Sequence, residues 1–247
     1  MKSTKMFISA LVLTSLVGGA VASAAEVGVY TSNGVVGFVE NDDPTNPVDP
    51  ENPENEVEPI DPTNPGGDPN PGTGGSLSID FVSSLVFGEN KISSNDETYF
   101  ANAQELKDGT FRGNYAQVTD KRGTNVGWSL KVKQDGQFRN EDTLNEELAG
   151  AEITFSNPAL SSNTQGVTAP TATGFALDPM GEEALVMSAA EGAGAGTWLN
   201  MFGTVEEMEG VQKNKAVALS VPGSIAKDAV SYKTRLMWVL SDAPGNE

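Results

Sequence analysis

The chain has 247 residues, a formal net charge of −19, and neither histidine nor cysteine. Without those residue types, Ser-His-Asp catalysis, Cys-His catalysis and disulfides are excluded, and a zinc site would need carboxylates alone, which zinc rarely uses. The excess of acidic residues also argues against nucleic acids and anionic membranes as partners, because binding to either requires a basic surface.

Residues 1–25 have the three parts of a secretory signal peptide: two lysines, an apolar run over residues 6–17, and small residues ending in Ala-Ser-Ala. The apolar run is shorter than the roughly 20 residues of a membrane-spanning helix. We therefore expect export, followed by cleavage that leaves no membrane insertion. The C-terminal residues 242–247 contain no Leu-Pro-x-Thr-Gly box, and without cysteine no lipid-modified N-terminus can form. We therefore expect that the protein either diffuses away from the cell or is held on its surface non-covalently by the folded part.

Two segments precede the main domain. In residues 26–40, two β-branched and aromatic runs flank Asn33-Gly34, which predicts a hairpin with a type I′ turn that pairs with the domain. Residues 41–75 hold nine of the fourteen prolines, and residues 26–75 hold eleven acids and no lysine or arginine. Such a composition favours extended polyproline conformations and buries little. We expect residues 41–75 to be a flexible linker or an exposed loop.

Residues 76–247 consist of short apolar-alternating runs separated by Gly, Asn, Asp and Pro, which is the pattern of β-strands. The predicted strands are residues 78–82, 126–133, 150–155, 216–221 and 231–240. In residues 126–133 the apolar side chains fall on one face, and Ser129, Lys131 and Lys133 fall on a face predicted to be wet. Residues 142–149 and 204–209 are the two expected helices, the first with Asp142 as N-cap. The sequence thus predicts an all-β chain with a single antiparallel β-sandwich domain.

Two Trp-x-Leu tripeptides stand about a hundred residues apart. The second lies in a longer phrase that runs Tyr-x-x-x-Leu-Met-Trp-x-Leu-x-x-x-Pro. This arrangement resembles the signature of the WxL-domain surface proteins of Gram-positive bacteria, which has Thr where this chain has Met237. The residues that carry the resemblance are Trp128, Leu130, Tyr232, Leu236, Trp238, Leu240 and Pro244. The resemblance implies an exported protein that is held non-covalently on the cell wall and works with other surface proteins anchored in the membrane or wall.

The three tryptophans are expected to differ in role. Trp128 and Trp238 each share a strand face with aliphatic residues, which favours a place in the core over direct contact with glycan, although both roles stay open. Trp198 follows the glycine-rich run 192–196 and is the better candidate for an exposed aromatic. That glycine-rich run could be mistaken for a phosphate-binding loop, but a strand follows it where a helix would be required, so it predicts a tight loop.

No enzyme activity, cofactor or metal site is expected. Glycoside hydrolysis by a pair of carboxylates is the remaining catalytic option. Because the whole protein is acidic, the paired glutamates are instead interpreted as solvent-exposed surface residues. No spacing typical of a calcium loop occurs. The favoured interpretation is a secreted, non-catalytic surface protein that binds peptidoglycan. The alternatives are an adhesin for host matrix protein or glycan that a partner retains on the cell and, third, a wall glycan hydrolase.

Overall fold

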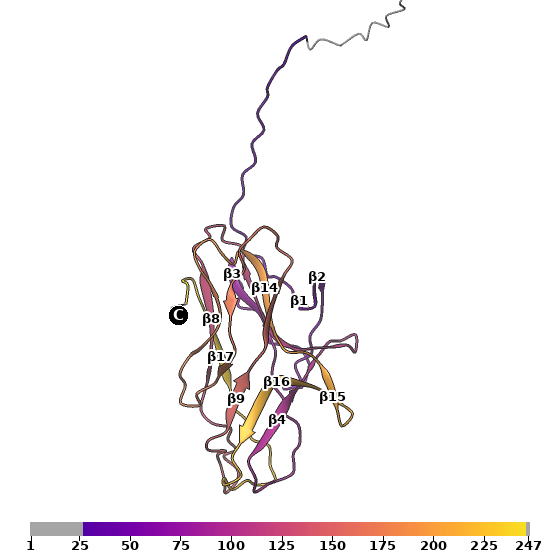
Figure 1. The fold of residues 1–247 in the computed structure, drawn as a ribbon, viewed down its shortest axis with the longest axis vertical. Coiled ribbons are helices and arrows are strands. Elements are labelled where there is room, and N and C mark those ends of the chain that lie inside the picture. The colour runs from indigo at the N-terminus through magenta and orange to yellow at the C-terminus, as the bar shows by residue number, and fades with distance from the viewer. Residues whose placement is uncertain (1–26, 246–247) are drawn as a thin grey trace, which may run out of the picture. The chain divides into compact units, whose positions relative to one another are not determined.

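Three antiparallel sheets form the folded part of the chain (Figure 1). This computed structural model describes residues 27–245, so the predicted signal peptide over residues 1–25 lies outside the described residues. The chain divides after Gly37 into two compact units. Within residues 27–245 every strand belongs to the second unit, and no helix occurs. The prediction of an all-β chain is confirmed.

Each sheet is named here by a central strand. The β7 sheet has, in spatial order, β10 (Pro158–Ser162), β14 (Gly196–Phe202), β7 (Asn114–Asp120) and β3 (Leu77–Val82). The β8 sheet has β11 (Thr171–Ala172), β13 (Ala184–Ala189), β8 (Trp128–Gln134) and β17 (Leu236–Ser241). The β16 sheet has β12 (Phe175–Ala176), β9 (Glu152–Phe155), β16 (Val211–Val221) and β15 (Glu206–Met208), with β4 (Glu97–Asn102) also paired to β16. Two small pairs are β1 (Val48–Asp49) with β2 (Asn52–Glu56), and β5 (Gln104–Glu105) with β6 (Phe111–Arg112).

The main hydrophobic core joins the inner faces of the three sheets. Val118 of β7, Leu130 of β8 and Val217 of β16 are all fully buried in this one cluster. Because side chains alternate along a strand, β7 and β8 contribute every second residue to the cluster, whereas register shifts in β13 and β16 bring consecutive residues into it. The arrangement agrees with the predicted antiparallel sandwich.

The predicted alternation in β8 is confirmed on its apolar face. Trp128, Leu130 and Val132 are each 0% exposed. The opposite face is less wet than predicted, because Ser129 is buried while Lys131 and Lys133 are half-buried. The Ser129 hydroxyl donates to the Ala243 carbonyl at 3.0 Å, so the C-terminal residues cover this part of the strand.

Both predicted helices are wrong. Residues 142–149 form turns, and the loop is held by side chains from residues 228 and 232, which compete successfully with local helix propensity. In residues 204–209, β15 pairs with β16 through a tight hairpin. Glu209 and Gly210 have φ values of 52° and 81°, as the two central residues of a type I′ turn require.

The expectations for the N-terminal segments also change. Residues 27–40 contain no strand and all have exposed side chains, so the predicted hairpin is absent. An isolated two-stranded hairpin is only marginally stable in water, which accounts for its absence. Residues 41–75 are more than a spacer, because they contain β1 and β2 and bury Val48 and Asp61. Val48 packs with Phe81, Tyr115 and Leu199 in a second small core.

Candidate functional site

The two Trp-x-Leu motifs lie in neighbouring strands. β17 pairs antiparallel with β8, and in this register Leu240 lies opposite Leu130 while Trp238 lies opposite Val132. Segments that are a hundred residues apart in the sequence therefore form one continuous part of the β8 sheet. The two halves of the motif define a structural unit rather than two separate sites.

Trp128 lies fully buried in the core. Its side chain is 0% exposed, and its indole Nε1 donates to the Gly194 carbonyl at 2.9 Å. Gly194 has a φ of 74°, and a Cβ placed there would lie 2.7 Å from the Trp128 Nε1 and closer still to the Cβ of Ala189. Only glycine fits at this position, both because of the positive φ and because of the close approach.

Trp198 is also buried, so the expectation of an exposed aromatic is wrong. It is 6% exposed and its Nε1 donates to the Ala195 carbonyl at 3.0 Å. The glycine-rich run 192–196 thus accepts hydrogen bonds from two indoles. Its small residues allow the backbone to approach both rings, which is a packing role that periodicity alone does not reveal.

The second motif occupies a partly exposed edge strand. Leu236, Trp238 and Leu240 pack against the main core but remain half-buried, because in the described part of the chain β17 has a neighbouring strand on one side only. Met237, on the other face of β17, is 41% exposed. Strand structure begins at Leu236, so the predicted strand over residues 231–240 is confirmed only in its second half. Lys233 forms an isolated bridge with Arg139.

Tyr232 ties two loops together. Its hydroxyl donates to the Asn145 carbonyl at 2.8 Å and accepts from the Asp228 backbone N–H at 2.9 Å. The Asp228 carboxylate in turn accepts from the Thr143 hydroxyl and from the Asn145 backbone N–H. These hydrogen bonds, the one from Thr143 first, lower the pKa of Asp228. The tyrosine of the motif therefore fixes the loop that precedes β9 to the segment that leads into β17.

Pro244 is exposed, and its neighbours hold the C-terminal segment in place. Besides the bond from Ser129 to Ala243, the Gly245 N–H donates to the Ser188 hydroxyl at 3.0 Å. Of the eight residues selected from the sequence, the structure assigns Trp128, Leu130 and Trp198 to the buried core. It assigns Leu236, Trp238 and Leu240 to the edge, Tyr232 to a loop junction and Pro244 to the surface.

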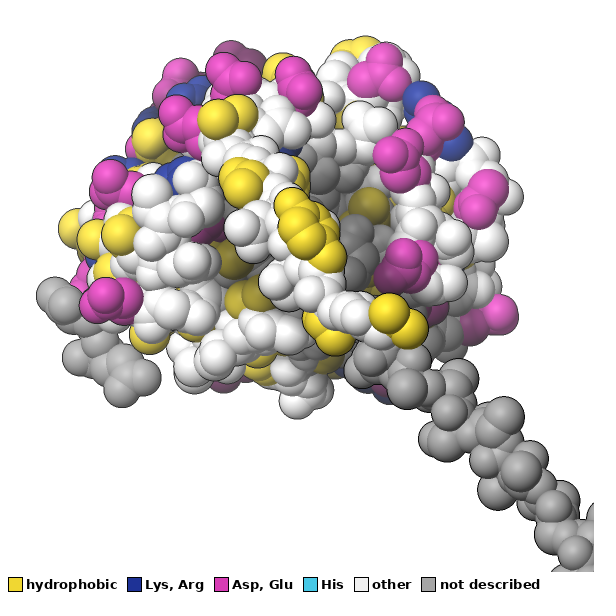
Figure 2. All heavy atoms as spheres, turned by 90° about the horizontal axis from the view of Figure 1, so that it is seen from above, with side chains coloured by type: hydrophobic (Ala, Val, Ile, Leu, Met, Phe, Trp, Pro, Cys, Tyr) yellow, Lys and Arg dark blue, Asp and Glu magenta, His cyan; other side chains and the backbone are white. Residues whose placement is uncertain are grey.

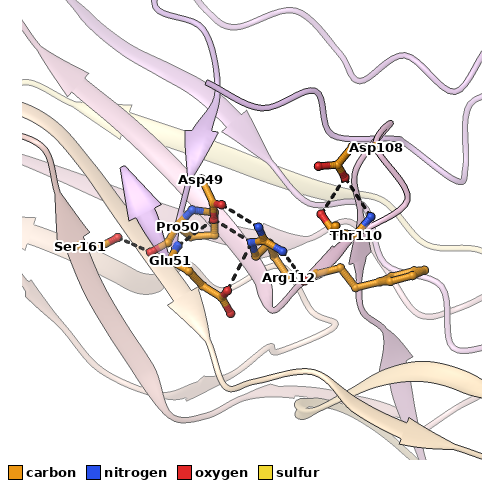
Figure 3. Close-up of polar contacts among 8 residues, drawn as sticks. Asp49, Pro50, Glu51, Asp108, Thr110, Arg112 and Ser161 are labelled. Carbon is orange, nitrogen blue, oxygen red and sulfur yellow. Dashed lines mark hydrogen bonds and ion pairs between the residues drawn. The ribbon is translucent and has the colours of Figure 1, made fainter. Parts of the chain in front are cut away.

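A polar cluster that the sequence did not indicate fastens the β1–β2 hairpin (Figure 3). The Arg112 guanidinium donates from Nε and Nη2 to the two carboxylate oxygens of Asp49, both at 2.7 Å, and Glu51 lies 3.5 Å away. The bond from Arg112 lowers the pKa of Asp49, and the same bond raises the pKa of Arg112. The Ser161 hydroxyl donates to the Pro50 carbonyl at 2.8 Å, on the other side of the hairpin (Figure 3).

A second set of hydrogen bonds joins the same hairpin to the Gln117 side chain of β7. The Gln117 side chain accepts from the Val48 N–H at 2.8 Å and donates to the Asn46 carbonyl at 3.0 Å. It also donates to the buried carboxylate of Asp80 at 2.9 Å. Burial raises the pKa of Asp80 despite the hydroxyl and amide groups that donate to it. The proline-rich segment is therefore fixed to the β7 sheet by side chains that lie far downstream in the sequence.

The surface has two depressions, and the second is lined in part by residues that flank the β1–β2 hairpin. One, of about 440 Å³, is lined by apolar Ile60, Val86 and Phe111 together with the side chains of Asn102 and Gln212, among others. The other, of about 530 Å³, is lined by residues 56–59 and 106–108, among others. The first depression thus combines one aromatic ring and aliphatic side chains with amide-bearing residues and one acid, Glu105.

Charged side chains of both signs lie on the face of the molecule that Figure 2 shows. Figure 2 shows Asp and Glu side chains around much of the rim of one face, with Lys and Arg between some of them. No group of three or more acidic residues is close enough to hold a metal ion within residues 27–245. None of the described elements is a helix that could cross a membrane.

The fold and the paired motifs define an all-β module in which two Trp-x-Leu strands are built into one sheet. A family model described as WxL domain surface cell wall-binding matches residues 25–244, nearly the whole chain. The chain belongs to this WxL-domain family. No curated protein and no solved structure shows significant similarity to it.

Proposed function

We propose that the chain is exported and attaches non-covalently to peptidoglycan, acting as a binding module rather than as an enzyme. The single observation that carries the proposal is the match to a surface cell wall-binding family over residues 25–244. The signal peptide features of residues 1–25 support export. The lack of histidine and cysteine leaves few groups for catalysis.

The charge of the protein limits how the wall can be recognised. Loss of residues 1–25, which carry two lysines and no acid, changes the formal net charge from −19 to −21. Wall teichoic polymers are anionic, and like charges repel within a Debye length of about 8 Å at physiological salt. Binding must then come from hydrogen bonds to glycan hydroxyls and stem-peptide amides and from apolar contact with sugar rings.

The depression of about 440 Å³ is the surface that best meets these requirements. Phe111 offers a half-buried ring, and the side chains of Asn102 and Gln212 offer amide groups. The buried Trp128 and Trp198 are unable to stack on a sugar. In this proposal the Trp-x-Leu motifs are needed for binding because they build the sandwich that carries the surface.

Co-sedimentation with purified peptidoglycan, stripped of protein and teichoic polymer, tests the proposal. The double variant Phe111→Ala/Gln212→Ala should pellet less than the wild type, with an unchanged far-UV circular dichroism spectrum. The matched control Leu144→Ala/Gln165→Ala removes an apolar and an amide side chain at exposed positions outside the depression and should pellet normally.

Three other outcomes would redirect the proposal. Equal pelleting of both double variants would exclude the depression as the binding surface. Pelleting only with intact cells would identify another surface protein as the receptor. Loss of turbidity of the peptidoglycan suspension would indicate hydrolysis.

A further inference from the structure

The segment that precedes the folded domain exposes an unusual amount of apolar surface. Residues 27–39 carry no charge and include five valines, one tyrosine and one phenylalanine. Their side chains are almost fully exposed, for example Val35 at 99% and Phe38 at 91%. Contiguous apolar residues of this kind, rich in β-branched and aromatic side chains, are typical of a strand that adds to another sheet.

β17 provides an open edge for such a strand. It is six residues long, and among the strands of residues 27–245 it pairs with β8 alone. No backbone hydrogen bond joins its outer side to another described segment. The edge of β3, by contrast, is covered, because the Thr73 N–H donates to the Ile79 carbonyl at 2.9 Å. The half-buried Leu236, Trp238 and Leu240 show that the core continues to the β17 edge and is incompletely covered there.

We propose that residues 34–40 of one copy of this chain add as an antiparallel strand to β17 of a second copy. Strand addition of this kind uses main-chain hydrogen bonds for affinity and alternate side chains for register. The register follows from charge. Glu40 placed opposite Arg235 also brings Asp42 opposite Lys233, and all four side chains are exposed in the single copy.

The same register matches the side chains along the whole strand. On the inner face, Val35 and Val39 lie opposite Leu240 and Leu236, and Gly37 lies opposite Trp238, where the absence of a side chain leaves room for the indole. The outer face pairs Phe38 with Met237 and Val36 with Val239. The donated strand thus extends the apolar inner face of the β8 sheet over the exposed part of the core.

Pairing within one chain is disfavoured by strand direction and charge. The Asn41 N–H donates to the Lys121 carbonyl at 3.4 Å, and Arg122 donates to the carbonyl of Gly127 at 2.8 Å, directly before β8, whose first residues lie opposite the end of β17. A strand leading back from Asn41 would therefore meet the end of its own β17, run parallel to it and bring Glu40 near Asp242. A second copy allows the antiparallel direction and opposite charges. Because donor and acceptor differ, the contact is heterologous and forms rings or open chains of copies.

Cysteine pairing tests the proposal cleanly, because the chain has no cysteine of its own. Two single variants, Phe38→Cys and Met237→Cys, the latter carrying a size tag, are mixed in the mature form under mild oxidation. The predicted register yields a disulfide-linked heterodimer on a non-reducing gel. Val39→Cys mixed with the same Met237→Cys variant is the matched control, because neighbouring residues point to opposite faces of a strand. The double variant Phe38→Cys/Met237→Cys should give a ladder of linked copies.

Equal yields for the Phe38→Cys and Val39→Cys mixtures would overturn the register. A double variant that links only within one chain would overturn pairing between copies. Sedimentation velocity adds an independent readout without disulfides. The mass of the wild type should rise with concentration, and Val36→Asp should abolish this rise while Thr31→Asp, outside the paired residues, leaves it intact. A wild type that stays monomeric at every soluble concentration would refute the proposal.

A charge exchange distinguishes the proposed ion pair between Glu40 and Arg235 from non-specific apolar association. Arg235→Glu should weaken self-association by placing like charges together, and Glu40→Arg in the same chain should restore it. Failure of the second change to rescue the first would contradict the antiparallel register. These readouts do not depend on wall binding, so their outcome is separate from that of the proposed function.

Discussion

Replacement of Trp128 by alanine tests the structural role of the first motif. The side chain is fully buried, and burial of an indole of about 200 Å² at about 25 cal/mol per Å² stabilises the fold by about 5 kcal/mol. Large-to-small changes of buried aromatics cost about 3–5 kcal/mol when the cavity does not collapse. Loss of the indole N–H also leaves the Gly194 carbonyl without its partner. We expect Trp128→Ala to lose about 3–5 kcal/mol of the free energy of unfolding, which lowers the Tm by about 6–20 °C at about 2–4 °C per kcal/mol.

Urea unfolding followed by far-UV circular dichroism measures this loss. Trp238→Ala is the matched control, because it makes the same chemical change at a half-buried position on an edge strand and should cost about half as much. A loss below about 1 kcal/mol for Trp128→Ala would refute the assignment of this residue as a core anchor. So would a stable, folded Trp128→Ala variant that no longer binds the wall, because it would point to direct contact.

Three further predictions concern the contacts around the motifs. Gly194→Ala should destabilise the fold by about 2–4 kcal/mol in urea unfolding, because the positive φ is strained for alanine and the new Cβ would overlap Trp128. An unchanged urea midpoint would contradict this close packing of Gly194 against the indole. Tyr232→Phe should cost about 1 kcal/mol and speed hydrogen exchange in residues 140–147, whereas equal exchange rates would show that the hydroxyl does not fix this loop. Asp49→Asn should cost about 1–3 kcal/mol at neutral pH through the lost bond to Arg112. Because Arg112 lowers the pKa of Asp49, this stabilisation is complete above the ordinary pKa of 3.8 and is lost as the pH falls through the lowered value. A difference between wild type and Asp49→Asn that persists in strong acid would argue against the ion pair as its source.

Alternation of apolar residues predicted the strands that became β3, β8, β9, β16 and part of β17, but it did not indicate β4, β7 or β13. In residues 126–133 every second side chain is apolar. Trp128, Leu130 and Val132 of that face are indeed buried, whereas Val126, which precedes the strand, is 46% exposed. The pattern did not reveal position in the sheet, because β8 and β17 carry the same alternation although one is central and the other lies at an edge. Partners far apart in the sequence decide that difference.

The incorrect predictions share one physical cause: contacts between residues far apart in the sequence outweigh the local preferences of a segment. Trp198 follows a glycine-rich loop that looks exposed, but the loop folds onto the core and accepts hydrogen bonds from both buried indoles. The proline-rich residues 41–75 have the composition of a spacer. They are nevertheless held on the domain by Arg112 and Gln117, which lie more than sixty residues downstream in the sequence. The composition of a segment does not show which distant residues will bind it, so neither Arg112 nor Gln117 could be identified as its partner.

The most direct test of the central claim is equilibrium binding of the mature chain to purified peptidoglycan as the salt concentration rises. With a formal charge of −21 the protein cannot depend on Coulomb attraction to an anionic wall. The account predicts saturable binding that stays constant or strengthens between about 50 and 300 mM NaCl, since added salt screens only repulsion. No binding to the purified polymer, or a steep loss of binding over that range, would contradict it.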